Sequence, residues 1–162
     1  MGTIMLKDMQ PEDIVGNSKE IILELYGGLK RRVFVSEIET PYPDGKLIVS
    51  STDPSGVIKK VNQAFVEMSG YSESELIGSP HSILRHPDMP PVAFKDLWDT
   101  ICNEKIWQGY VKNLRKDGGF YWVKATVIPN IRKGKIVGYT SVRRKPARSK
   151  IEDCIKRYPT LF

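Results

Sequence analysis

The chain has 162 residues, of which 40% are hydrophobic and 27% are charged. This length suits one domain, and the apolar fraction is large enough for a buried core, which excludes a wholly disordered chain. No apolar run approaches the roughly 18 residues of a membrane helix, and Asp8, Glu12 and Asp13 argue against a signal peptide. Cys102 and Cys154 have neither disulfide nor metal spacing. We therefore expect a soluble, cytoplasmic protein of a reducing compartment.

The net charge of +6 is unevenly distributed along the chain. Residues 1–42 and 43–102 carry net charges of −2 and −3, whereas residues 103–162 carry 15 basic and 4 acidic groups, a net charge of +11. Such a stretch can meet nucleic acid, anionic lipid, a ligand phosphate or an acidic protein surface. It also suits a sheet edge that lysine and arginine keep solvated. Because no nucleic-acid-binding motif accompanies the charge, we favour the sheet edge and expect no nucleic-acid partner.

The first 42 residues are expected to form an N-terminal extension that contains a helix. Residues 1–16 look irregular, and a helix is predicted over residues 18–32, with Ser18 as its N-cap. Four apolar residues in this segment recur with helical spacing: Ile21, Ile22, Leu25 and Leu29. Gly27 and Gly28 weaken that pattern. A turn-rich run at residues 40–45 marks the boundary to a sensory domain over residues 43–146, and residues 147–162 form a C-terminal helical tail.

The remaining chain predicts strands and helices in a definite order. Strands are expected over residues 47–51, 57–61, 107–115, 120–128 and 136–142. Two helices are expected over residues 62–68 and 149–157. A third begins at a capping box formed by Ser72 and Glu75, and a fourth follows Pro90 and Pro91. Two strands, then helices, then three strands suit an antiparallel sheet with helices on one face, which is an α+β domain.

The strand that begins at Trp107 carries one candidate binding group. A period of two places Trp107, Gly109, Val111 and Asn113 on the same face. If that face points inward, the Asn113 amide needs a hydrogen-bond partner. A planar ligand stacked on Trp107 could supply that partner, but an exposed face or a local backbone hydrogen bond explains the pattern at least as well.

The proline-rich segment 80–90 contains both histidines of the chain. Prolines stiffen the segment, so its polar groups can be presented at a low entropic cost. Arg85 suits a phosphate or carboxylate, and Asp88 could accept a hydrogen bond from a ligand or cap the following helix. His86 could ligate haem, although one histidine is a weak signal. Since no nucleophile elbow, Walker loop or dinucleotide glycine motif is present, we expect no enzymatic activity.

These segments resemble a known family. Residues 47–144 are similar to a PAS domain, and specifically to the sensory domain of bacterial aerotaxis receptors, as in stand-alone energy-taxis PAS proteins. The matching stretches are VNQAF (61–65), SGY (69–71), PH (80–81), RHPDMP (85–90), WQG (107–109), VKN (111–113), FYWV (120–123) and GKIVGY (134–139). The RHPDMP run is the most specific of them.

The resemblance implies an α+β PAS fold in which a five-stranded antiparallel sheet, flanked by N- and C-terminal helices, holds FAD. It implies a redox sensor for energy taxis or aerotaxis that signals to a membrane chemoreceptor or signalling protein, with a homodimer also possible. Carried over by position, the cofactor contacts are Asn62, His81, Arg85, His86, Asp88, Trp107 and Asn113. Phe94 is a further member by position, and its helical stripe also explains it as core. The alternatives are a haem-binding gas sensor and a cofactor-free interaction module.

Overall fold

The computed structural model describes residues 6–162, so residues 1–5 of the predicted irregular segment lie outside the described residues. Its main feature is a five-stranded sheet in the order β4-β3-β7-β6-β5, in which every neighbouring pair is antiparallel. The strands are β3 (Ile48–Thr52), β4 (Ile58–Val61), β5 (Trp107–Leu114), β6 (Phe120–Arg132) and β7 (Lys135–Arg144). The predicted α+β fold with a five-stranded antiparallel sheet is confirmed.

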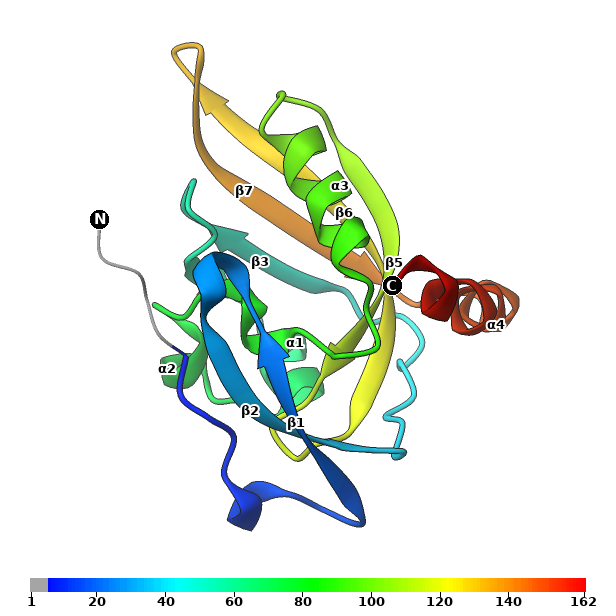
Figure 1. Ribbon diagram of the computed structural model, residues 1–162. Coiled ribbons are helices and arrows are strands. Elements are labelled where there is room, and N and C mark those ends of the chain that lie inside the picture. Colours follow the sequence, from blue (N-terminus) through cyan, green and yellow to red (C-terminus); the bar gives the residue numbers. More distant parts are fainter. Residues whose placement is uncertain (1–5) are drawn as a thin grey trace.

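The chain between β4 and β5 forms short helices that cover one face of the sheet (Figure 1). They are α1 (Gln63–Ser69), α2 (Glu73–Leu76), the 3-10 helix η3 (His81–Leu84) and α3 (Pro91–Ile101). The predicted capping box between Ser72 and Glu75 is present. The N-cap of α3 is Pro90, so the alternative that Asp88 caps this helix is wrong.

The N-terminal segment is a β-hairpin, and the helix predicted over residues 18–32 is wrong. β1 (Ser18–Glu24) pairs antiparallel with β2 (Lys30–Ser36). The two strands are joined through Gly27 and Gly28, whose φ values of 71° and 77° lie in the left-handed region that favours glycine.

Packing explains why the strand pattern prevails in this segment. Leu23 and Val33 are buried together with Leu114 of β5, whereas Ile22 is 56% exposed. The apolar residues of β1 therefore alternate between the protein and solvent with a period of two, which a helix cannot provide. Burial against β5 and the glycine turn together outweigh the helical spacing.

The C-terminal helix α4 (Arg148–Arg157) confirms the helix predicted over residues 149–157, and the 3-10 helix η4 (Tyr158–Leu161) follows it. Ile151 of α4 packs with Phe120 and Trp122, and the Tyr158 hydroxyl donates to the Tyr110 carbonyl over 2.6 Å. These β6 side chains alternate with Tyr121 and Val123 of the central core, so α4 covers the opposite face of the sheet. Within residues 6–162, none of the helices combines the length and the apolar composition that a membrane-spanning helix requires.

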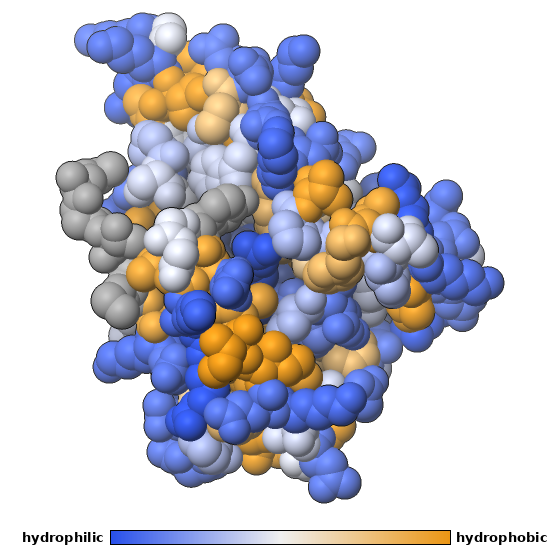
Figure 2. All heavy atoms as spheres, in the orientation of Figure 1, coloured by the Kyte–Doolittle hydropathy of each residue, from blue (hydrophilic) through white to orange (hydrophobic). Residues whose placement is uncertain are grey.

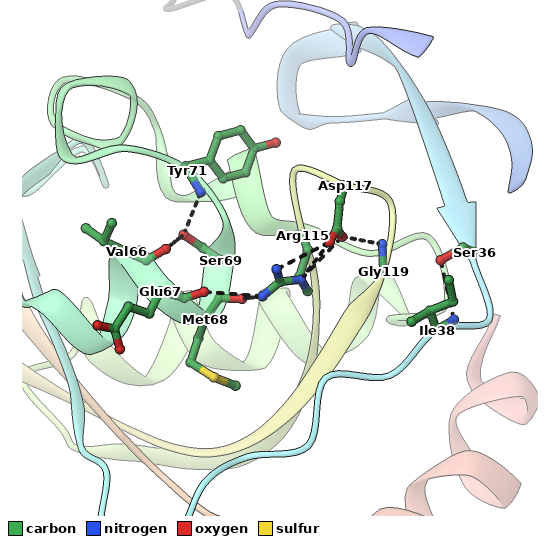
Figure 3. A network of polar contacts seen from close by, with 10 residues as sticks. All are labelled: Ser36, Ile38, Val66, Glu67, Met68, Ser69, Tyr71, Arg115, Asp117 and Gly119. Carbon is green, nitrogen blue, oxygen red and sulfur yellow. Dashed lines mark hydrogen bonds and ion pairs between the residues drawn. The ribbon is translucent and has the colours of Figure 1, made fainter. Parts of the chain in front are cut away.

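The turn between β5 and β6 ties α1 to the N-terminal hairpin. The Arg115 guanidinium donates to the carbonyls of Glu67 and Met68 in α1 and pairs with Asp117 over 3.3 Å (Figure 3). On the other side of the turn, the Ser36 amide at the end of β2 donates to the Gly118 carbonyl over 2.8 Å. The hairpin is therefore anchored to the sheet through its backbone as well as through its apolar face.

Candidate ligand-binding site

A cavity of about 840 Å³ lies between the inner face of the sheet and the segments η3 and α3. Leu25 and Leu29, on either side of the hairpin turn, line it from the N-terminal segment. Figure 2 shows the surface hollowed between the hairpin and α3, with hydrophobic and hydrophilic side chains around the hollow. Cavities of this size, mostly apolar with a few convergent polar groups, are typical of small-molecule and cofactor sites.

Trp107 forms a fixed apolar surface in this cavity. The residue is 9% exposed, and its indole Nε1 donates to Asp96 Oδ2 of α3 over 2.9 Å. Further apolar side chains complete the walls: Leu84, Met89, Phe94, Leu97, Ile101, Val111, Val123, Ala125 and Val127. The cavity can therefore enclose a flat, largely apolar ligand with an aromatic ring beside it.

Arg143 and His81 form the polar end of the cavity. Arg143 Nη2 lies 2.9 Å from Ser50 Oγ and 2.6 Å from His81 Nε2. Because a guanidinium can only donate, His81 Nε2 accepts this hydrogen bond, and the neutral ring carries its hydrogen on Nδ1. Burial and the neighbouring Arg143 charge lower the pKa of His81 to about 3. His81 is therefore a neutral acceptor at physiological pH.

Asn113 and Arg85 also line the cavity. Asn113 is 5% exposed, and the backbones of Asn113 and Arg85 form an isolated antiparallel bridge. The Arg85 guanidinium lies 4.6 Å from the centroid of the Phe94 ring. The structure thus brings together His81, Arg85, Trp107 and Asn113 of the predicted contacts, with Phe94 among them.

Asn62 does not line the cavity, because its side chain organises the backbone around it. Asn62 Oδ1 accepts hydrogen bonds from the amides of Val49 and Phe65 over 3.1 and 3.2 Å, and Nδ2 donates to the Leu47 carbonyl over 2.8 Å. The residue is the N-cap of α1 and connects that helix to β3.

His86 and Asp88 also lie outside the cavity lining. The His86 ring is 2% exposed and meets the Phe120 ring edge to face at 6.2 Å. Its Nδ1 accepts from the Asp88 amide over 3.0 Å, while the Asp88 carboxylate pairs with Lys112 over 2.8 Å. Burial, with the nearby Lys112 charge, lowers the pKa of His86 to about 4. His86 is therefore not placed to ligate a haem held in this cavity.

Sequence reasoning missed the side chains that β7 contributes, namely Tyr139, Ser141 and Arg143. All three fall on the inner face of β7, since they alternate along the strand. Arg143 is 2% exposed, although it belongs to a run of basic residues that suggests a solvated edge. The alternation of side chains along the strand could have revealed this position. A period of two places Arg143 on the same face as Tyr139 and on the opposite face from the exposed Arg144. Residues 6–162 contain no group of three side chains suited to hold a metal ion.

Comparison with known proteins identifies the family. The model of the PAS fold family matches residues 58–143, more than half of the chain. The aerotaxis receptor of Escherichia coli is 44% identical over 118 residues, which cover 73% of this chain and 23% of the receptor. A nitrogen fixation regulatory protein of Klebsiella oxytoca is 26% identical over 161 residues, covering 98% of this chain and 30% of that protein. The chain thus spans less than a third of the length of these two relatives.

Solved structures agree with this assignment at the level of the fold. The light state of the aureochrome1 LOV domain superposes with a TM-score of 0.62 at 22% identity, covering 69% of this chain and 91% of that domain. A PAS domain from Colwellia psychrerythraea superposes with a TM-score of 0.57 at 25% identity, covering 62% and 86%. The cavity between sheet and helices, the matched residues and the similarity to a receptor segment lead to one conclusion: the chain belongs to the PAS fold family and forms a PAS sensor domain similar to that of the aerotaxis receptor.

Proposed function

We propose that this PAS domain binds FAD and acts as a redox sensor for energy taxis or aerotaxis. The single observation that carries the proposal is the cavity of about 840 Å³, with Trp107 on one wall and Asn113, His81 and Arg143 as its polar groups. The similarity to the aerotaxis receptor supports the same assignment. A bound flavin would supply a ring that changes charge and hydrogen-bonding demand when it is reduced.

The residues of the cavity fit such a ring. An isoalloxazine is flat and apolar over most of its surface, which suits the indole of Trp107 and the aliphatic wall. Its carbonyl and nitrogen edge needs hydrogen bonds, and Arg143 Nη1 is a buried donor with no hydrogen-bond partner among the described residues. We assign Trp107 to stacking and Asn113, His81 and Arg143 to the polar edge.

The structure offers a route from this cavity to the N-terminal hairpin. Arg31 of β2 is 3% exposed and donates to the Ile83 carbonyl in η3 and to the Tyr71 hydroxyl, over 3.0 and 3.1 Å. The next residue of η3, Leu84, lines the cavity, as does Leu25 beside the hairpin turn. The backbone of Asn113 forms a bridge with Arg85, the residue that follows η3. We infer that a change in the hydrogen bonds of Asn113 reaches the hairpin through η3, and we assign signal output to the hairpin.

Our proposal places this domain in the cytoplasm, with a membrane chemoreceptor or another signalling protein as its partner. We assign it no enzymatic activity. The two rival functions differ in the cofactor: a haem-binding gas sensor would show a Soret band, and a cofactor-free interaction module would be colourless. The visible spectrum of gently purified protein tests the proposal, because a bound oxidised flavin absorbs in the blue.

A further inference from the structure

The turn between β6 and β7 projects beyond the rest of the sheet. β5 pairs with β6 only as far as Val127, and β3 pairs with β7 only from Tyr139 onward. Residues 130–138 therefore form a two-stranded ribbon that no other strand of residues 6–162 flanks, and Figure 1 shows it reaching past the end of α3. This ribbon is at the opposite end of β6 from the turn that contacts the N-terminal hairpin.

The end of the ribbon carries three basic side chains without acidic partners. Arg132 and Lys135 are directly opposite each other, and Lys133 and Gly134 form the turn between them. None of these three basic side chains forms an ion pair or a hydrogen bond within the part of the chain that the structure describes. Like charges directly opposite each other on neighbouring strands are destabilising, so an anion from outside the chain would stabilise this arrangement.

Lys133 has a backbone conformation that lysine rarely adopts. Its φ is 53° and that of Gly134 is 74°. Two central residues with positive φ are typical of a type I′ turn, which favours Asn, Asp or Gly at the first of them. Lysine therefore weakens the turn, and its side chain makes no compensating contact with residues 6–162. Such departures from a local rule occur at functional positions.

Two exposed aliphatic side chains flank the basic turn. Ile131 is 48% exposed and Val137 is 50% exposed. A projecting turn that combines aliphatic side chains with lysine and arginine matches the surface of an anionic bilayer, where apolar groups enter the boundary between headgroups and acyl chains and cations meet the phosphates. An acidic protein surface would pair with the charges but would leave Ile131 and Val137 against polar groups.

We propose that the β6–β7 tip, residues 131–137, docks on a membrane that contains anionic phospholipids. Three cations and two aliphatic side chains give a weak contact, so the docking is reversible. It does not depend on flavin binding. It accounts for part of the basic charge of the C-terminal third of the chain, and it concentrates the domain beside the membrane partner assigned to it above.

The test is co-sedimentation of the full chain with lipid vesicles. We expect binding to vesicles of equal parts of phosphatidylglycerol and phosphatidylcholine, and none to vesicles of phosphatidylcholine alone. Raising NaCl from about 0.1 M to about 1 M shortens the Debye length from about 10 Å to about 3 Å and should release the protein. Absence of binding to the anionic vesicles, which is the result expected for an acidic protein partner, would overturn the inference.

Variants of the tip separate docking from folding. Lys133→Asn should weaken the association about fivefold, which corresponds to about 1 kcal/mol for one charge near the surface. It should not lower the stability of the fold, because asparagine suits the turn. Ile131→Ser combined with Val137→Ser should also weaken the association, although the net charge is unchanged. Wild-type association in either variant would contradict the docking.

The matched control removes the same charge from another exposed surface. Arg132→Gln combined with Lys133→Asn should weaken the association about 25-fold, since two charges are lost. Lys156→Gln combined with Arg157→Gln, at the exposed end of α4, should weaken it less than about twofold. Equal losses in the two double variants would assign the binding to net charge alone and overturn the inference. A protein that docks but binds no flavin refutes only the proposed function.

Discussion

The indole of Trp107 lies across Gly109, two residues further along the same face of β5. A Cβ atom added at position 109 would overlap Cη2 and Cζ2 of the indole. The indole Nε1 donates a hydrogen bond to the Asp96 carboxylate of α3 over 2.9 Å, which fixes the ring in this position. Glycine at this position therefore allows the aromatic ring to lie flat along the strand and to face the cavity.

We predict that Gly109→Ala weakens flavin retention by displacing the Trp107 ring. The expected loss is that of the stacking interaction, about 0.5–1.5 kcal/mol, or roughly a two- to tenfold weaker affinity. Titration of apo protein with FAD, followed by quenching of flavin fluorescence, measures it. Trp107→Ala should weaken binding at least as much, and Gln108→Ala, on the outer face of the strand, should not. Wild-type affinity in folded Gly109→Ala and Trp107→Ala would show that this wall does not hold the ring.

Arg31 is predicted to stabilise the hairpin against the core. Its guanidinium makes three hydrogen bonds, to the carbonyls of Lys7 and Ile83 and to the Tyr71 hydroxyl. Arg31→Gln leaves some of these buried acceptors unpaired, so the free energy of unfolding in urea should fall by about 2–3 kcal/mol.

The matched control for Arg31 is Lys30→Gln, which removes the same charge one residue away. Lys30 is exposed and lies 4.0 Å from Glu24, so its loss should change the free energy of unfolding by less than about 1 kcal/mol. Equal effects of the two substitutions would mean that the buried contacts of Arg31 do not secure the hairpin.

Asn113 is predicted to transmit the redox state to the hairpin. Its amide can donate or accept, so it can respond to the altered hydrogen-bonding demand of a reduced ring. Hydrogen exchange of β1 and β2 should differ between oxidised and reduced wild type, because a signal requires a differential interaction with the two states. Asn113→Ala should reduce that difference while retaining the fold. Identical exchange of the two wild-type redox states outside the cavity would rule out this route.

Acid should destabilise the fold through the buried His86. Its pKa is about 4 in the folded chain, against about 6.5 in the unfolded chain. As the pH falls below about 6.5 the unfolded state binds the proton first, so stability that is present above this pH is lost as the pH falls toward 4. Protonation of Nδ1 would also oppose the hydrogen bond that it accepts from the Asp88 amide.

Urea unfolding at pH 7 and pH 5.5 measures the contribution of His86. We expect the wild type to lose about 1 kcal/mol more than His86→Gln over this interval, because glutamine does not titrate. A loss of equal size in the two proteins would assign the acid sensitivity to other groups. His81, whose pKa is about 3 for the same physical reason, is the first candidate for any remainder.

The sheet and the central helices were predictable because local signals agree with tertiary packing. Asn62 and the Ser72–Glu75 box mark helix starts by hydrogen bonds to nearby amides, and the structure contains both. The hairpin was not predictable in the same way, since Ile21, Leu25 and Leu29 fit a helical period, whereas contact with Leu114 of β5 favours the strand. That contact is between residues far apart in the chain.

The candidate site was predictable only in part for a related reason. A motif places a residue type at a position, but the direction of the side chain depends on its partners. Asn62 and His86 accept hydrogen bonds from backbone amides, and the Asp88 carboxylate forms an ion pair with Lys112. None of the three side chains therefore lines the cavity. Arg143 was overlooked because its charge suggests exposure, yet the alternation of β7 places it inside.

The absorption spectrum of the gently purified protein, combined with chromatography of the cofactor released on denaturation, tests the central claim most directly. We predict a yellow protein whose blue absorption bleaches on addition of dithionite and returns in air, and whose released cofactor elutes with FAD. A Soret band, or a folded protein that stays colourless after incubation with excess FAD, would contradict it.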